Sequence, residues 1–173
     1  MKGIFSGPTF AGLLAVSQTA ILSTAQYDIE EIMTPEKIIA YCEAHWETYK
    51  SDCSGFVKAV AHELGAKPEG NANEISGYIQ QLPQITSDGM TAATWASEGK
   101  LVVADLKGED HQPVRSHGHV VVVVAGPLAH DKYPTACWGT LGSTGRKNQT
   151  LNWAWNTRDR DRLTYAVIDL LTT

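Results

Sequence analysis

A cysteine and a histidine stand where the sequence could place a nucleophile beside a base. Cys53 opens the stretch Cys53-Ser54-Gly55-Phe56, and His119 follows Gly118 at the head of a run of valines. A thiol and an imidazole are the minimum set for acyl transfer. The imidazole accepts the thiol proton, the thiolate attacks a carbonyl carbon, and the imidazolium protonates the leaving amine. We therefore predict Cys53 as the nucleophile and His119 as the general base.

The residues around Cys53 predict a helix that carries the thiol in its first turn. Ser51 or Asp52 can cap its start, and Gly65 can end it. Its apolar residues recur at the spacing of one buried stripe: Phe56, Val57, Val60, Ala61 and Leu64. Unpaired N–H groups at a helix N-terminus stabilise a thiolate, and that of Cys53 is a candidate oxyanion-hole donor. Position alone still favours a buried structural thiol.

His119 is the best candidate base because a strand would hold its imidazole rigidly at the edge of a sheet. Gly118 before it would let another group approach closely. His117 is a second candidate base, although a structural role is the better interpretation for it and for the remaining histidines: His45, His62, His111 and His130. A third group usually orients such an imidazole. Thr140 or a backbone carbonyl near Trp138 are the candidates, and Asp131 is a weaker one.

The elements that must position this pair change character along the chain. Helical patterns are predicted near Pro8, from Thr34 through Trp46, over 53–64, from Asn73 to Leu82, and over 91–98, with Asn73 as the cap of the fourth. Extended patterns follow over 101–106, 119–125, 136–141 and 163–170. The continuous valine run of 119–125 implies cover on both faces of its strand. Helices followed by strands predict an α+β fold with a mainly antiparallel sheet.

Composition and charge limit the classes of partner that we expect this chain to bind. The chain has 173 residues and a net charge of −5, with no basic block, so we expect no nucleic-acid partner. No apolar run is long enough to span a membrane, and we expect no membrane partner. Trp153 and Trp155 are typical of aromatic cover for a core, and the alternating charges from Arg158 to Arg162 are typical of a solvated turn.

The domain boundary is predicted near residue 33. Residues 1–33 form an N-terminal extension, either a helix or a delivery segment, and 34–173 form the main domain. Lys2 and a later apolar stretch are features of a secretory signal, but Pro8 and polar residues interrupt the apolar region. The cysteines number three, without a CxxC motif. A Cys42–Cys137 bridge is compatible with the sequence, and their redox state is left open.

Eight blocks of sequence, in order across about residues 38–170, carry a family resemblance. They are Cys53-Ser54-Gly55-Phe56-Val57, Glu63-Leu64-Gly65, Gly70-Asn71-Ala72-Asn73, Leu106-Lys107-Gly108, Gly118-His119-Val120, Gly126-Pro127-Leu128, Lys132-Tyr133-Pro134 and the segment 155–163. The chain resembles the NlpC/P60 papain-like cell-wall peptidases, and more closely the first family of type VI secretion amidase effectors.

This resemblance implies a papain-like fold whose N-terminal helices pack on the sheet. It implies a cysteine endopeptidase that cuts the γ-D-glutamyl–meso-diaminopimelate bond of peptidoglycan stem peptides, with Cys53 as nucleophile and His119 as base. It implies secretion by the producer, action in the periplasm of a target Gram-negative cell, a cognate immunity protein and a type VI tube or spike component as partners. We expect a monomer and no metal or organic cofactor.

Two features depart from the family pattern. The connection from Gly108 to Gly118 is longer than the usual connection of the family, and because it leads into His119 it could reshape the substrate cleft or the immunity contact. Residues 1–33 lie outside the match. A phage or housekeeping NlpC/P60 hydrolase, or a non-catalytic wall-binding protein on the same scaffold, are the alternative functions. The first would carry a clear signal peptide or wall-binding module, and the second would lose the thiol or the imidazole.

Overall fold

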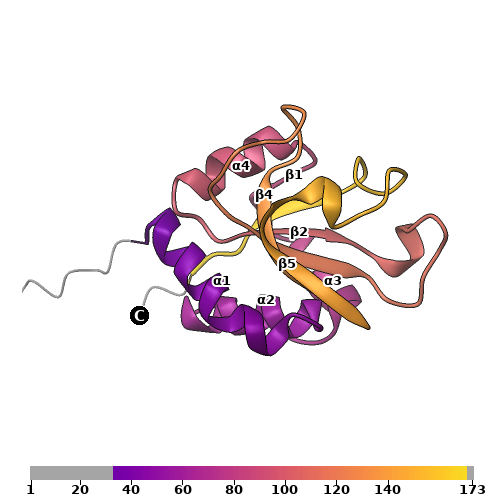
Figure 1. The fold of residues 1–173 in the computed structure, drawn as a ribbon, viewed down its shortest axis with the longest axis horizontal. Helices are drawn as coiled ribbons and strands as arrows, with labels where there is room; N and C mark the ends of the chain where they lie inside the picture. The colour runs from indigo at the N-terminus through magenta and orange to yellow at the C-terminus, as the bar shows by residue number, and fades with distance from the viewer. Residues whose placement is uncertain (1–32, 171–173) are drawn as a thin grey trace, which may run out of the picture. The chain divides into compact units, whose positions relative to one another are not determined.

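Four α-helices and a six-stranded sheet make up the computed structural model, which describes residues 33–170 (Figure 1). The helices are α1 (Pro35–Tyr49), α2 (Cys53–Glu63), α3 (Ala72–Ile79) and α4 (Gly89–Ser97). The strands are β1 (Ile85–Thr86), β2 (Val102–Leu106), β3 (His119–Val123), β4 (Thr135–Thr140), β5 (Ser143–Thr150) and β6 (Thr164–Val167), with 3-10 turns η1 (Gly108–Asp110) and η2 (Leu151–Trp153). The helix predicted near Pro8 lies outside the described residues.

The strands lie in the order β1-β6-β2-β3-β4-β5, and every neighbouring pair is antiparallel. The prediction of an α+β fold with a mainly antiparallel sheet is therefore confirmed. Sequence patterns missed two strands. β1 has two residues, and β5 (Ser143–Thr150) is polar and mostly exposed at the sheet edge, so it has no apolar alternation to reveal it.

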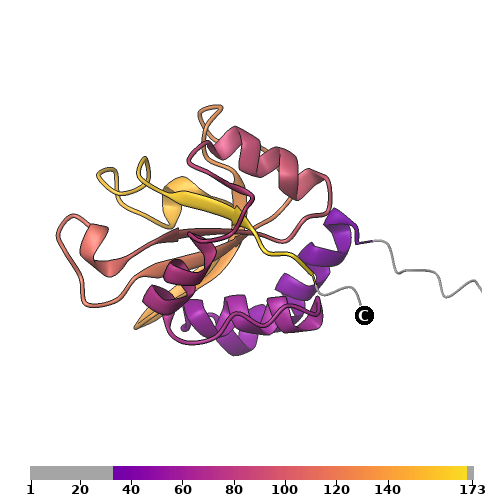
Figure 2. The same cartoon turned by 180° about the vertical axis from the view of Figure 1, so that it is seen from behind.

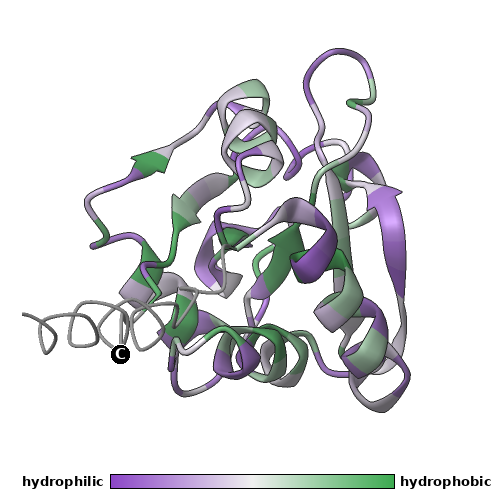
Figure 3. Ribbon diagram, turned by 90° about the vertical axis from the view of Figure 1, so that its left-hand side faces the viewer, coloured by the Kyte–Doolittle hydropathy of each residue, from purple (hydrophilic) through white to green (hydrophobic). Residues whose placement is uncertain are grey.

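Each face of the sheet has its own core, as the valine run predicted. Val120 and Val122 of β3 pack in one cluster with residues of α1, α2 and α3, while Val121 and Val123 pack in a second cluster with α4 and Trp155. Figures 1 and 2 show α1–α3 on one side of the sheet and α4 on the other. Figure 3 shows hydrophobic colour concentrated on the central strands between them. Burial on both faces explains why β3 needs no polar residue after His119.

Local capping signals account for most helix boundaries. Thr34 caps α1 by accepting from the Lys37 N–H at 3.3 Å, and Gly65 ends α2 at φ 80°. The predicted cap of α3 was wrong: the cap is Asn71 rather than Asn73, because Glu74 stands three residues after Asn71 and completes a capping box. Helix α4 likewise starts earlier than predicted, since Asp88 accepts from the Thr91 N–H at 2.8 Å.

One carboxyl group is buried in the core between α3 and the sheet. Asp105 of β2 is fully buried, and its Oδ2 accepts a hydrogen bond from Gln80 Nε2 at 3.0 Å. Its other oxygen has no hydrogen-bond partner within residues 33–170. Burial disfavours the charged form and raises the pKa of Asp105 from 3.8 to about 6, although the polar side chains of Ser76 and Gln80 beside it oppose the shift.

We expect Asp105→Asn to flatten the pH dependence of stability. A native pKa of about 6 against 3.8 means that the native state holds this proton more tightly, so wild-type stability falls as pH rises from about 4 to about 6. Asparagine cannot ionise, so the variant should resist urea better relative to wild type at pH 7.5 than at pH 4. Urea unfolding at both values measures this, with exposed Asp169→Asn as control. An equal difference at both values would contradict it.

Candidate active site

Hydrogen bonds from two strands fix the turn that precedes Cys53. The Lys50 carbonyl accepts from the Thr140 N–H at 3.0 Å and from the Gly145 N–H at 2.7 Å. Thr140 ends β4 and Gly145 lies in β5, so the edge of the sheet holds the link between α1 and α2. The start of α2 is thereby placed against the sheet by backbone contacts.

Gly139 makes this close approach sterically feasible. A Cβ atom at Gly139 would lie 2.1 Å from the Tyr49 carbonyl oxygen and 2.6 Å from the Asp52 carbonyl oxygen. Those contacts are with backbone, which cannot swing aside. Any side chain at this position would push β4 away from the residues just before Cys53, and glycine is required here for that reason.

Cys53 is the first residue of α2, with 5% of its surface exposed. Asp52 caps the helix: its Oδ1 accepts from the Gly55 N–H at 2.9 Å and from the Ser54 hydroxyl at 3.0 Å. Burial raises the pKa of the Cys53 thiol, and the Asp52 carboxylate adds to that rise. Backbone N–H groups, of which Val120 contributes the strongest, lower the pKa without cancelling the effect of burial. The resting group is therefore the neutral thiol.

His119 is the first residue of β3 and is nearly buried. Its ring packs against the Trp155 ring in a T-shaped contact, with centroids 4.8 Å apart. Burial lowers the pKa of His119 to about 3, and positive charge from His111, Arg115 and His117 lowers it further. The resting imidazole is neutral, which is the form that accepts a proton. Trp155 covers the core as predicted, but Trp153 is 60% exposed, so the prediction of core cover is wrong for Trp153. Trp155 also orients the His119 ring, a contact that no sequence pattern indicated.

Cys53 and His119 line one cavity of about 70 Å³. The remaining lining residues are Arg115, His117, Gly118, Thr140, Leu141 and Ala154. The structure thus brings together both predicted catalytic residues, the second candidate base and Thr140. Trp138 and Asp131 do not line this cavity, and the Trp138 carbonyl already accepts from Trp46 Nε1 at 3.2 Å. The third group therefore stays a prediction, with Thr140 the better placed candidate.

The space at Gly118 is occupied by the protein itself. A Cβ atom there would lie 2.8 Å from both Asn73 Oδ1 and the Leu106 carbonyl oxygen. Asn73 also bridges the two ends of the loop before His119, because its Oδ1 accepts from the Gly108 N–H at 2.9 Å and its Nδ2 donates to the Ser116 carbonyl at 3.1 Å. Asn73 therefore anchors the loop to α3 and does not cap that helix.

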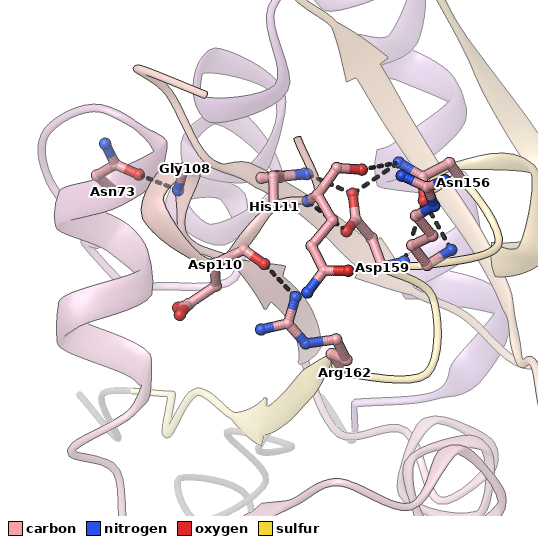
Figure 4. Close-up of polar contacts among 9 residues, drawn as sticks. Asn73, Gly108, Asp110, His111, Asn156, Asp159 and Arg162 are labelled. Atoms are coloured by element: carbon pink, nitrogen blue, oxygen red, sulfur yellow. Dashed lines mark hydrogen bonds and ion pairs between the residues drawn. The ribbon is translucent and has the colours of Figure 1, made fainter. Parts of the chain in front are cut away.

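A buried histidine–aspartate hydrogen bond anchors the middle of the same loop (Figure 4). His111 Nδ1 lies 2.8 Å from Asp159 Oδ2, and both side chains are almost fully buried. The Gln112 N–H and Asn156 Nδ2 donate to the same carboxylate, each at 2.8 Å. Burial opposes the charge of Asp159, but these hydrogen bonds outweigh it and lower its pKa. The interpretation of 158–162 as a solvated turn is therefore wrong for Asp159.

The three cysteines differ in whether a reagent can reach their thiols from a cavity. All are free thiols, and Cys42 and Cys137 are completely buried beside one another, whereas Cys53 lines the cavity.

Within residues 33–170, no group of three His, Cys, Asp or Glu side chains could hold a metal ion. In the same part of the chain, no helix has the length and apolar character needed to cross a membrane.

We expect iodoacetamide to alkylate Cys53 before the other two thiols, and to do so faster as pH rises. Only the thiolate reacts, and burial raises the pKa of Cys53, so the rate should still be climbing above pH 9. Peptide mapping by mass spectrometry over a pH series measures both points. Labelling of Cys42 first, or a rate already at its plateau at pH 7, would contradict this description of the resting thiol.

Comparison with known proteins adds an independent observation. No family model matches the chain. The sequence is 41% identical over 145 residues to the peptidoglycan amidase Tse1 of Pseudomonas aeruginosa strain PAO1. This match covers 77% of the chain and 90% of that protein.

Proposed function

Since the chain belongs to the type VI secretion amidase effectors, the family of Tse1, we propose that it is a cysteine amidase of peptidoglycan. We propose the γ-D-glutamyl–meso-diaminopimelate bond as its target. The observation that carries this proposal is the shared cavity of Cys53 and His119, at a helix start and a strand start respectively. A structural thiol would have no need of a neutral imidazole on the same open cavity.

The proposed reaction begins with both groups neutral. His119 accepts the Cys53 proton as the sulfur attacks the γ-carbonyl carbon, and the N–H of Cys53 stabilises the oxyanion. The imidazolium then donates that proton to the diaminopimelate nitrogen, the C–N bond breaks, and a thioester remains. Water, deprotonated by His119, hydrolyses the thioester and restores the thiol. Burial favours the neutral pair, so the charged pair forms only during the reaction.

The remaining proposals concern the setting of this activity. We propose that the producer exports the protein on a type VI tube or spike component, that it acts as a monomer in the target cell's periplasm, and that an immunity protein blocks it. Residues 34–173 would form the catalytic domain and 1–33 an extension. A non-catalytic wall-binding protein is the weaker alternative, because both reactive groups are present on one cavity.

The direct test is product analysis. Purified protein is incubated with diaminopimelate-type peptidoglycan, and the soluble fragments are identified by mass spectrometry. The expected products are glycan-linked stems that end in D-Glu and released peptides that begin with diaminopimelate. Intact stems would contradict the amidase proposal, and fragments cut at another bond would contradict the proposed specificity.

A further inference from the structure

A second, polar cavity lies next to the one that holds the thiol. It has a volume of about 380 Å³ and is lined by Asn73, Lys107, Glu109, Arg115 and Ser116. Arg115 lines both cavities. Arg115 is therefore common to the cavity that contains Cys53 and to a space large enough for part of a peptide.

The backbone of Arg115 is held while its side chain is free. The Arg115 N–H donates to the Gly108 carbonyl at 2.9 Å, and Asn73 bridges the same loop at Gly108 and Ser116. Within residues 33–170, the exposed guanidinium makes no hydrogen bond or ion pair. A guanidinium carries five N–H donors. A residue whose backbone is fixed and whose side-chain donors are all free is suited to bind an acceptor group of a ligand.

The charges around this cavity favour an anionic group. Lys107 is also without an ion pair among the described residues, and Glu109 is the one acid that lines the space. No ion pair joins Glu109 to either cation in that part of the chain. Two cations against one acid give the lining of this cavity a net positive charge, which is a local exception in a chain of net charge −5. A guanidinium matches a carboxylate with two parallel hydrogen bonds.

We propose that Arg115, assisted by Lys107, binds a free carboxylate of the peptide substrate next to the scissile bond. This inference rests on the proposed function. A stem peptide joined through the γ-carboxyl of D-Glu keeps a free α-carboxylate on one side of that bond, and diaminopimelate carries a free carboxylate at its other end. The chemistry is the same for both sources. Arg115 is then a specificity-determining residue that sets the position of the stem against Cys53.

The test compares steady-state kinetics of wild type, Arg115→Gln, Arg115→Lys and Lys107→Gln on one soluble stem peptide. A lost charge-assisted contact at an exposed site should raise KM about tenfold in Arg115→Gln, with kcat within about twofold. Arg115→Lys keeps the charge but loses the paired donors of the guanidinium, so its KM should lie between those of wild type and Arg115→Gln. Lys107→Gln should raise KM by a smaller factor. Arg158→Gln is the matched control, because Arg158 is exposed and lines neither cavity.

Amidated substrates identify the carboxylate. One peptide is amidated at the D-Glu α-carboxyl and another at the free carboxyl of diaminopimelate. On the peptide that lacks the bound carboxylate, the KM of wild type should rise by about the same factor of ten. Arg115→Gln should not raise the KM for that peptide any further. Equal KM values for Arg115→Gln and Arg158→Gln on the unmodified peptide would overturn the proposal. The proposal would also be overturned if Arg115→Gln raised KM by the same factor on both amidated peptides as on the unmodified one.

Binding to inactive protein separates this inference from the proposed function. If wild type cuts no stem peptide, the proposed function fails. Calorimetry with Cys53→Ala then still tests the subsite, since Cys53→Ala/Arg115→Gln should bind the same peptide about tenfold more weakly than Cys53→Ala. Equal dissociation constants for the two proteins would overturn the carboxylate subsite regardless of the activity result.

Discussion

Replacing Cys53 with alanine is expected to lower the rate of stem-peptide cleavage by at least ~10³-fold while leaving the fold intact. The cavity that Cys53 shares with His119 is lined by no other thiol, and its one hydroxyl, on Thr140, is a much weaker nucleophile at neutral pH. Alanine is a good helix former and removes one sulfur atom, so α2 should keep its cap and its packing. Product formation by chromatography and the thermal midpoint measure the two parts.

The matched control is Cys42→Ala, which removes a buried thiol that lies outside the cavity. It should retain activity at temperatures where it is folded. His119→Gln completes the comparison: it removes the base and should cost about 10²- to 10⁴-fold. Normal cleavage by Cys53→Ala, or equal losses in Cys53→Ala and Cys42→Ala, would remove Cys53 from the nucleophile role.

Asp159→Ala is expected to destabilise the protein by about 3–5 kcal/mol, because it breaks a buried pair and leaves its partners unsatisfied. The carboxylate accepts from the Gln112 N–H, from Asn156 Nδ2 and from His111 Nδ1, each at 2.8 Å. His111 would remain buried with neither ring nitrogen hydrogen-bonded, since its Nε2 has no partner within residues 33–170. Urea unfolding measures the loss, and exposed Asp169→Ala should change stability by less than about 0.5 kcal/mol.

The pH dependence provides a second measurement on the same pair. The pKa of Asp159 is lowered in the native state, so its contribution is fully present above the unfolded value of 3.8 and is lost as pH falls through the lower native value. Wild type should therefore lose stability on acidification below about pH 4 more steeply than Asp159→Ala. Parallel acid curves for the two proteins, or a loss no larger than that of Asp169→Ala, would show that the pair does not hold the loop.

Much of the candidate site was predictable because its signals are local. Asp52 caps a helix that starts at the next residue, and the apolar stripe from Phe56 to Leu64 identifies the buried side of that helix. The valine run after His119 identifies a strand covered on both faces. Such signals depend on neighbours within a turn or two of the chain, so they survive without knowledge of the rest.

What the sequence did not reveal depends on residues far apart in the chain. His111 pairs with Asp159 across 48 positions, and Asn73 closes a loop that starts 35 positions later. Neither contact has a periodicity, and each polar side chain alone is typical of a turn. The contact of Trp155 with His119, and the position of Arg115 on the lining of two cavities, likewise exist only in the folded chain.

Cys53 and His119 could thus be identified from the residues next to each of them in the sequence. Only the tertiary structure places both on the lining of one cavity. It depends on backbone contacts from Thr140 and Gly145 to Lys50 that hold the start of α2 at the edge of the sheet. Main-chain hydrogen bonds of this kind carry no residue signature, apart from the glycine at position 139 that lets the chains approach. For that physical reason, residue types and local spacing predicted the nucleophile and the base, and only the folded sheet decided what surrounds them.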